Sequence, residues 1–101
     1  MFGKLAEAKK KAEEVKERLQ HISVIGEAQG IRVVANGNRK IVAIERTNDR
    51  EMDQDELLDL IQIASNRALE QADKVAESEM SAIAQDLLPG GLGGLGSLFS
   101  K

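Results

Sequence analysis

The apolar residues near the start of the chain recur at alternating steps of three and four. This spacing places them in a narrow stripe along one side of an α-helix, and the segment is rich in Ala, Glu, Lys and Leu, which are strong helix formers. The pattern predicts a first helix over residues 3–20. The stripe consists of Leu5, Ala8, Ala12, Val15, Leu19 and Ile22.

Three short runs rich in β-branched residues follow the first helix. They cover residues 22–27, 31–36 and 39–46. Residues 26–30 supply the expected first turn, and Asn36-Gly37 supplies the second, because both Asn and Gly tolerate positive φ. The sequence therefore predicts a three-stranded antiparallel meander.

A second, longer helix is predicted after a polar loop over residues 47–52. Asp53 is the expected N-cap, with Asp55 and Glu56 in the first turn of a helix over residues 54–86. Pro89 and a glycine-rich run end that helix. We expect an α+β fold with one α-β-β-β-α domain over residues 1–88 and a disordered tail over residues 89–101.

The long helix is predicted to extend beyond the sheet. At about 1.5 Å per residue it spans about 50 Å, whereas a seven-residue strand covers only about 23 Å. The first helix is expected to leave the same end of the sheet, so the two overshooting segments would form an antiparallel helical arm. Acids of the second helix could then face some of the lysines of the first helix. These acids are Glu70, Asp73, Glu77 and Glu79.

The strands carry apolar residues on both of their faces. Alternation groups Ile22, Val24, Ile31 and Val33 on one face, yet the other face is not cleanly polar. A single strong helix cannot cover both faces, so we expect a homodimer in which a second copy buries the remainder. A monomer with the first helix folded over the second face is the alternative. The expected interface residues are Ile25, Val34, Val42 and Ile44.

The net charge of −3 conceals an uneven distribution along the chain. Residues 1–48 carry ten basic and six acidic side chains, a balance of +4, and residues 49–101 carry four basic and eleven acidic ones, a balance of −7. The basic half is a candidate surface for binding a polyanion. In the alternative interpretation, the two halves neutralise each other within the fold.

Several kinds of chemistry lack the residues they need. Without cysteine there is no disulfide, thiolate zinc site or cysteine nucleophile, and a single histidine, His21, cannot complete a catalytic site. The acids of residues 49–56 lack the spacing of an EF-hand calcium loop. Phe2 and Phe99 are the only aromatic residues, so there is no aromatic platform on which single-stranded bases could stack. We expect no enzyme activity, cofactor, metal or small-molecule substrate. With no apolar segment suited to a signal peptide or a membrane span, we expect a cytoplasmic protein without membrane association.

Several blocks, taken in order, resemble one known family. Met1-Phe2-Gly3-Lys4 opens the chain, GEAQGIRVVANG covers residues 26–37, LLDLI and ASNRA cover residues 57–61 and 64–68, and Leu88-Pro89-Gly90 follows the long helix. Their order and spacing are similar to those of the YbaB/EbfC family of bacterial nucleoid-associated proteins. The resemblance implies a homodimer with protruding helical arms that binds duplex DNA in the nucleoid with little sequence requirement.

The charge distribution and the resemblance together predict binding to double-stranded DNA through its phosphates. The main alternative is a protein-binding adaptor whose arm grips an acidic partner helix, because both functions would use the same lysines. The expected DNA-binding residues are Lys4, Lys9, Lys10, Lys11, Lys16 and Arg18, with Arg32, Arg39 and Lys40 as a weaker second group.

Overall fold

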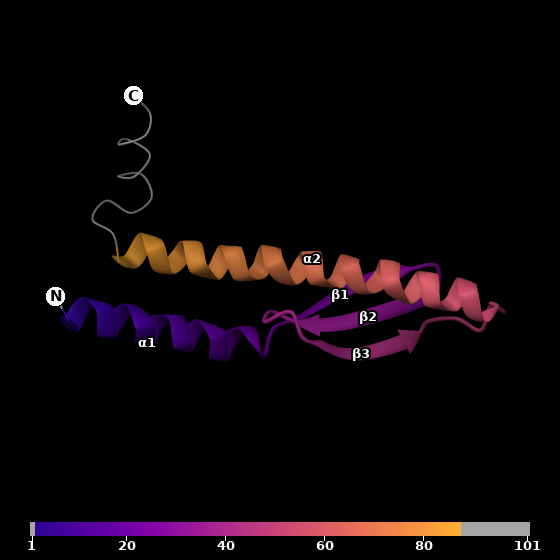
Figure 1. Cartoon of the computed structure of the whole chain (residues 1–101), viewed down its shortest axis with the longest axis horizontal. Coiled ribbons are helices and arrows are strands. Elements are labelled where there is room, and N and C mark those ends of the chain that lie inside the picture. The colour runs from indigo at the N-terminus through magenta and orange to yellow at the C-terminus, as the bar shows by residue number, and fades with distance from the viewer. Residues whose placement is uncertain (1, 88–101) are drawn as a thin grey trace, which may run out of the picture.

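The computed structural model describes residues 2–87 and contains a three-stranded antiparallel sheet, with one helix before it and one after it along the chain (Figure 1). The strand order is β1-β2-β3, so the predicted α+β meander is confirmed. The predicted disorder of residues 89–101 falls outside the described residues. The elements are α1 (Phe2–Leu19), β1 (Ser23–Ala28), β2 (Ile31–Asn36), β3 (Ile41–Arg46) and α2 (Gln54–Leu87).

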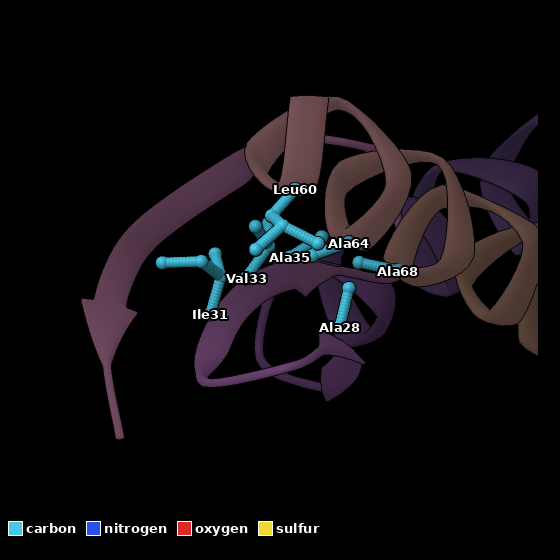
Figure 2. Packing of buried hydrophobic residues seen from close by; sticks show 7 residues of the cluster. All are labelled: Ala28, Ile31, Val33, Ala35, Leu60, Ala64 and Ala68. Atoms are coloured by element: carbon cyan, nitrogen blue, oxygen red, sulfur yellow. The ribbon is translucent and has the colours of Figure 1, made fainter. Parts of the chain in front are cut away.

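The first half of α2 packs across β1 and β2 on one face of the sheet (Figure 1). Residues at steps of four along α2 meet alternate residues of the two strands, as the helix and strand periods require. Figure 2 shows that most of these side chains are small, which brings the helix close to the sheet. The buried cluster comprises Ala28, Ile31, Val33, Ala35, Leu60, Ala64 and Ala68.

Gly26 in β1 allows the closest approach between helix and sheet. A Cβ at this position would lie 2.2 Å from the carbonyl oxygen of Ala64 and 2.3 Å from the backbone nitrogen of Ala68. Gly26 was expected in the first turn, but it lies within the strand. The turn itself is Gln29-Gly30, where φ is 41° and 97°. Gly26 is therefore needed for packing, whereas Gly30 serves the chain reversal.

The turn between β2 and β3 lies where Asn36-Gly37 predicted it, but its geometry differs from the expected one. Arg39, with φ of 66°, carries the left-handed conformation, and neither Asn36 nor Gly37 is among the described residues with positive φ. Asn36 is buried, and its Oδ1 accepts hydrogen bonds from the backbone nitrogens of Asn38 (2.9 Å) and Lys40 (3.2 Å). Asn36 thus acts as the acceptor that holds the turn together.

The same turn anchors the C-terminal end of α1. The Gly37 N–H donates to the carbonyl oxygens of Leu19 (2.8 Å) and Ile22 (3.0 Å), and Asn38 Nδ2 donates to the carbonyl oxygen of Lys16 (2.9 Å). Two of the three acceptors, the carbonyls of Lys16 and Leu19, lie in the last turn of α1, so these bonds tie the turn to the end of the helix. α1 then runs away from the sheet beside the second half of α2 (Figure 1). Together these two segments form the predicted arm.

The arm is packed at its base and open towards its tip. Val15 and Leu19 are 2% and 5% exposed, whereas Leu5, near the start of α1, is 65% exposed. The base is therefore the part of the arm whose geometry the hydrophobic stripe holds in place.

The predicted N-cap of α2 is confirmed. Asp53 Oδ1 accepts a hydrogen bond from the Glu56 backbone nitrogen at 2.8 Å, and the Asp53 carbonyl accepts one from Leu57 at 3.0 Å. The side chain thereby satisfies one of the free N–H groups of the first turn.

Candidate nucleic-acid interface

The cations of α1 lie on different sides of the helix. Lys9 and Lys16 are seven residues apart, as are Lys11 and Arg18, and seven residues make almost two helical turns. Lys11 and Arg18 border α2, where they line a cleft together with Ile83. Lys9 and Lys16 flank the apolar stripe on its other side and are exposed. Lys10 is also exposed, and the helical spacing turns it away from the stripe.

Two of the predicted DNA-binding cations are engaged by acids of α2. Arg18 Nη2 donates to Glu79 Oε2 at 2.8 Å, and Arg39 Nε lies 3.3 Å from Asp73 Oδ1. The sequence predicted that these acids could face lysines of α1; in the structure they meet two arginines. Exposed pairs of this kind contribute about 0.2–1 kcal/mol each, so they constrain the side chains more than they stabilise the fold.

Two further predicted cations have partners closer in the chain. Lys11 Nζ lies 3.8 Å from Glu7 Oε1 one turn earlier in α1, and Arg32 Nε donates to Glu27 Oε1 at 3.1 Å across β1 and β2. Within residues 2–87, the cations without an ion pair include Lys9, Lys10, Lys16 and Lys40. The side chain of Lys4 lies outside the described part of the chain.

The β2–β3 turn brings part of the second predicted group to the base of the arm. Asn38 contacts the backbone of Lys16, so its neighbours Arg39 and Lys40 lie close to the C-terminal turn of α1. Arg32 stands near the start of β2, at the end of the sheet away from the arm, and does not join this group. The structure therefore places Arg39 and Lys40 close to Lys16 at the end of α1.

Other arginines serve the fold. Arg67 Nη1 donates to the carbonyl oxygen of Glu27 at 2.6 Å, linking α2 to β1. Arg50 Nη1 pairs with Glu56 Oε1 at 2.6 Å, and its Nη2 donates to the carbonyl oxygen of Gln29 at 3.3 Å. Both arginines belong to the acidic half of the chain, and no local pattern in the sequence indicates these long-range contacts.

The expected interface residues do not share one face of the sheet. Ile25 pairs with Val34 on the face away from α2, but Ile44 pairs with Val33, which points towards α2. A β-bulge next to Val34 shifts the register, and Val42 lies at this irregularity. The grouping of Ile44 with Val34 on one face was therefore wrong, although both residues remain at or near the surface.

β3 is nevertheless the strand with the most exposed apolar surface. α2 covers β1 and β2, so Ile44 is 51% exposed even though it points to the helix side, and Ile41 is 41% exposed. Val42 is 56% exposed, and Ile25 of β1 is 50% exposed. Apolar side chains are thus uncovered along β3, and Ile25 adds one on the opposite face of the sheet.

Metal and membrane sites find no support in the described residues. No group of three or more His, Cys, Asp or Glu side chains within residues 2–87 is arranged to hold a metal ion. None of the described helices has the length and apolar character to cross a bilayer. His21 is exposed at the surface, where Nε2 lies 3.6 Å from Glu17 Oε1.

Sequence comparison identifies the family of the chain. The model of the YbaB/EbfC DNA-binding family matches residues 1–87, which is the whole described fold. The chain belongs to this family. The YbaB/EbfC resemblance noted from the sequence blocks is thus confirmed.

Named relatives agree with the YbaB/EbfC assignment. A nucleoid-associated protein of Thermus thermophilus is 37% identical over 99 residues, covering 93% of this chain and 87% of the relative. One from Flavobacterium johnsoniae is 31% identical over 101 residues, covering 98% and 94%. One from Chlorobium phaeobacteroides is 33% identical over 82 residues, covering 79% and 74%. The similarity therefore extends over the arm as well as the sheet.

Proposed function

We propose that this protein binds duplex DNA as a homodimer, chiefly through phosphate contacts and with little sequence specificity. Family membership and the nucleoid-associated relatives support DNA as the partner and the nucleoid as the location. The contacts with DNA are assigned to the cations of α1 and the β2–β3 turn.

The observation that carries this proposal is the set of exposed cations without an intramolecular ion pair. Among the described residues, Lys9, Lys16 and Lys40 combine exposure with the absence of a carboxylate partner, and Lys16 and Lys40 belong to elements joined by a hydrogen bond. Lysine carries its charge on a flexible side chain. It therefore suits phosphates better than base edges, whose donors and acceptors have fixed positions. Such contacts position a protein on DNA without reading its sequence.

The homodimer is supported by the uncovered apolar surface of β3. An edge strand with exposed apolar residues favours pairing with another chain. We place the centre of the interface at Ile41, Val42 and Ile44 of β3, and Ile25 and Val34 extend it on the opposite face of the sheet. Ile41 extends the set expected from the sequence.

A mobility-shift titration at two salt concentrations tests the DNA-binding proposal. With about four to six phosphate contacts, affinity should fall roughly a hundred- to a thousandfold between about 50 and 200 mM salt. Unrelated duplexes of equal length should bind with similar affinity. A strong preference for one duplex, or an affinity that salt does not change, would contradict phosphate-based binding.

A further inference from the structure

Two arginines of the proposed DNA-binding surface are held by acids of the same chain. Arg18 comes from the last turn of α1 and Arg39 from the β2–β3 turn, yet both pair with α2, through Glu79 and Asp73 respectively. The two guanidinium side chains remain 59% and 58% exposed, so a phosphate can reach them. The same groups are therefore accessible to DNA and engaged by carboxylates.

The acids that hold these arginines differ from their neighbours on α2. Asp73 and Glu79 are partly buried against the rest of the arm. Glu70 and Glu77 are exposed, and within residues 2–87 neither has a cation at ion-pair distance. Of the four acids of α2 that the sequence predicted to face α1, two thus lie against cations of the proposed DNA-binding surface.

We propose that Asp73 and Glu79 limit the affinity for DNA by competing with phosphates for Arg39 and Arg18. This inference rests on the proposed function. A guanidinium binds carboxylate and phosphate with the same fork of N–H donors, so a paired acid takes a donor that a phosphate could use and offsets the charge that attracts it. Because both ion pairs are exposed, solvent and salt screen them, so a phosphate can compete with each carboxylate at ordinary ionic strength.

A matched pair of double variants tests the competition. Asp73→Asn with Glu79→Gln frees both arginines, whereas Glu70→Gln with Glu77→Gln removes the same charge from α2 without freeing a cation. Both doubles change the net charge from −3 to −1. If each freed arginine gains one phosphate contact, the first double should steepen the slope of log affinity against log salt by about 1.8 and bind at least about tenfold tighter near 100 mM salt. The control double should keep the parent's slope.

A double-mutant cycle between Arg18 and Glu79 gives a second measurement. Arg18→Gln should weaken DNA binding less in the parent, where Glu79 occupies the arginine, than in a Glu79→Gln background. Equal losses in both backgrounds would overturn the competition. This cycle alters only Arg18 and Glu79 and leaves Asp73 in place, so it remains decisive if the first double does not fold.

The outcomes separate this inference from the function on which it rests. If the parent binds DNA and the two doubles behave alike, the competition is wrong and DNA binding stands. If neither the parent nor any variant binds DNA, the proposed function is wrong and the inference falls with it. Circular dichroism and light scattering on every variant confirm that the comparison is made between folded proteins of one oligomeric state.

Discussion

At the scale of single residues, the turn between β2 and β3 depends on a buried hydrogen-bond acceptor and on a glycine that lies against α1. Asn36-Gly37 marked the second turn because such pairs are frequent in hairpins. The buried Asn36 instead accepts two backbone hydrogen bonds, and a Cβ at Gly37 would lie 2.8 Å from Leu19 Cδ2. The contact with Leu19 joins residues far apart in the sequence, so no local pattern could have predicted it.

Replacement of Gly26 by alanine should destabilise the fold. Gly26→Ala places a Cβ against the backbone of α2, 2.2 Å from the Ala64 carbonyl oxygen, and the helix must shift to accept it. We expect the free energy of unfolding to fall by about 3 kcal/mol, at the upper end for an overpacked site. Urea denaturation measures this change.

Gly3→Ala is the control for that experiment. A Cβ at Gly3 meets no atom within 4 Å, and alanine is the better helix former, so stability should stay level or rise by up to about 1 kcal/mol. Equal stability of Gly26→Ala and the parent would show that β1 and α2 separate easily and that Gly26 does not set their distance.

At the scale of elements, periodicity predicted the helices and strands to within a residue or two, but not the face on which each strand residue lies. Ala35 pairs with Ile41 next to the turn, but beyond the bulge odd positions of β2 meet even positions of β3, as in Val33 with Ile44. The length of the turn and the bulge beside Val34 set this parity. A one-residue difference there exchanges the faces of β3, which explains why the expected interface set was divided between them.

Removal of two lysine charges from α1 should weaken DNA binding. Lys9→Gln together with Lys16→Gln removes two exposed charges without an ion pair, and it should reduce the salt slope of DNA binding by about 1.8. Affinity should weaken similarly on unrelated duplexes, because phosphate contacts carry no sequence information. Mobility-shift titrations over a series of salt concentrations measure both effects.

Lys74→Gln is the control for the α1 lysines. Lys74 is exposed on the acidic helix α2, so its loss should leave the salt slope unchanged. If the double variant remains a folded protein and binds DNA as well as the parent, the assignment of the contacts to this side of α1 is wrong.

At the scale of the whole molecule, the uneven covering of the sheet favours association. α2 lies over β1 and β2 and leaves β3 uncovered, so Ile41, Val42 and Ile44 are exposed. The sequence predicted surplus apolar surface from a simple count, since one helix cannot cover two faces. It could not locate the surplus, because that depends on where α2 crosses the sheet, which Gly26 and the alanines of α2 determine.

We therefore predict a dimer with β3 at its centre. Light scattering coupled to size exclusion should report about twice the chain mass of 11.0 kDa at micromolar concentration. Ile44→Asp should shift that mass towards one chain, because an unpaired carboxylate in an apolar interface costs several kcal/mol. Met80→Asp is the matched control: Met80 is 50% exposed and Ile44 is 51% exposed, but Met80 lies on the arm. A parent mass of one chain at every concentration would refute the dimer, and dissociation by Met80→Asp with an intact Ile44→Asp dimer would move the interface from β3 to the arm.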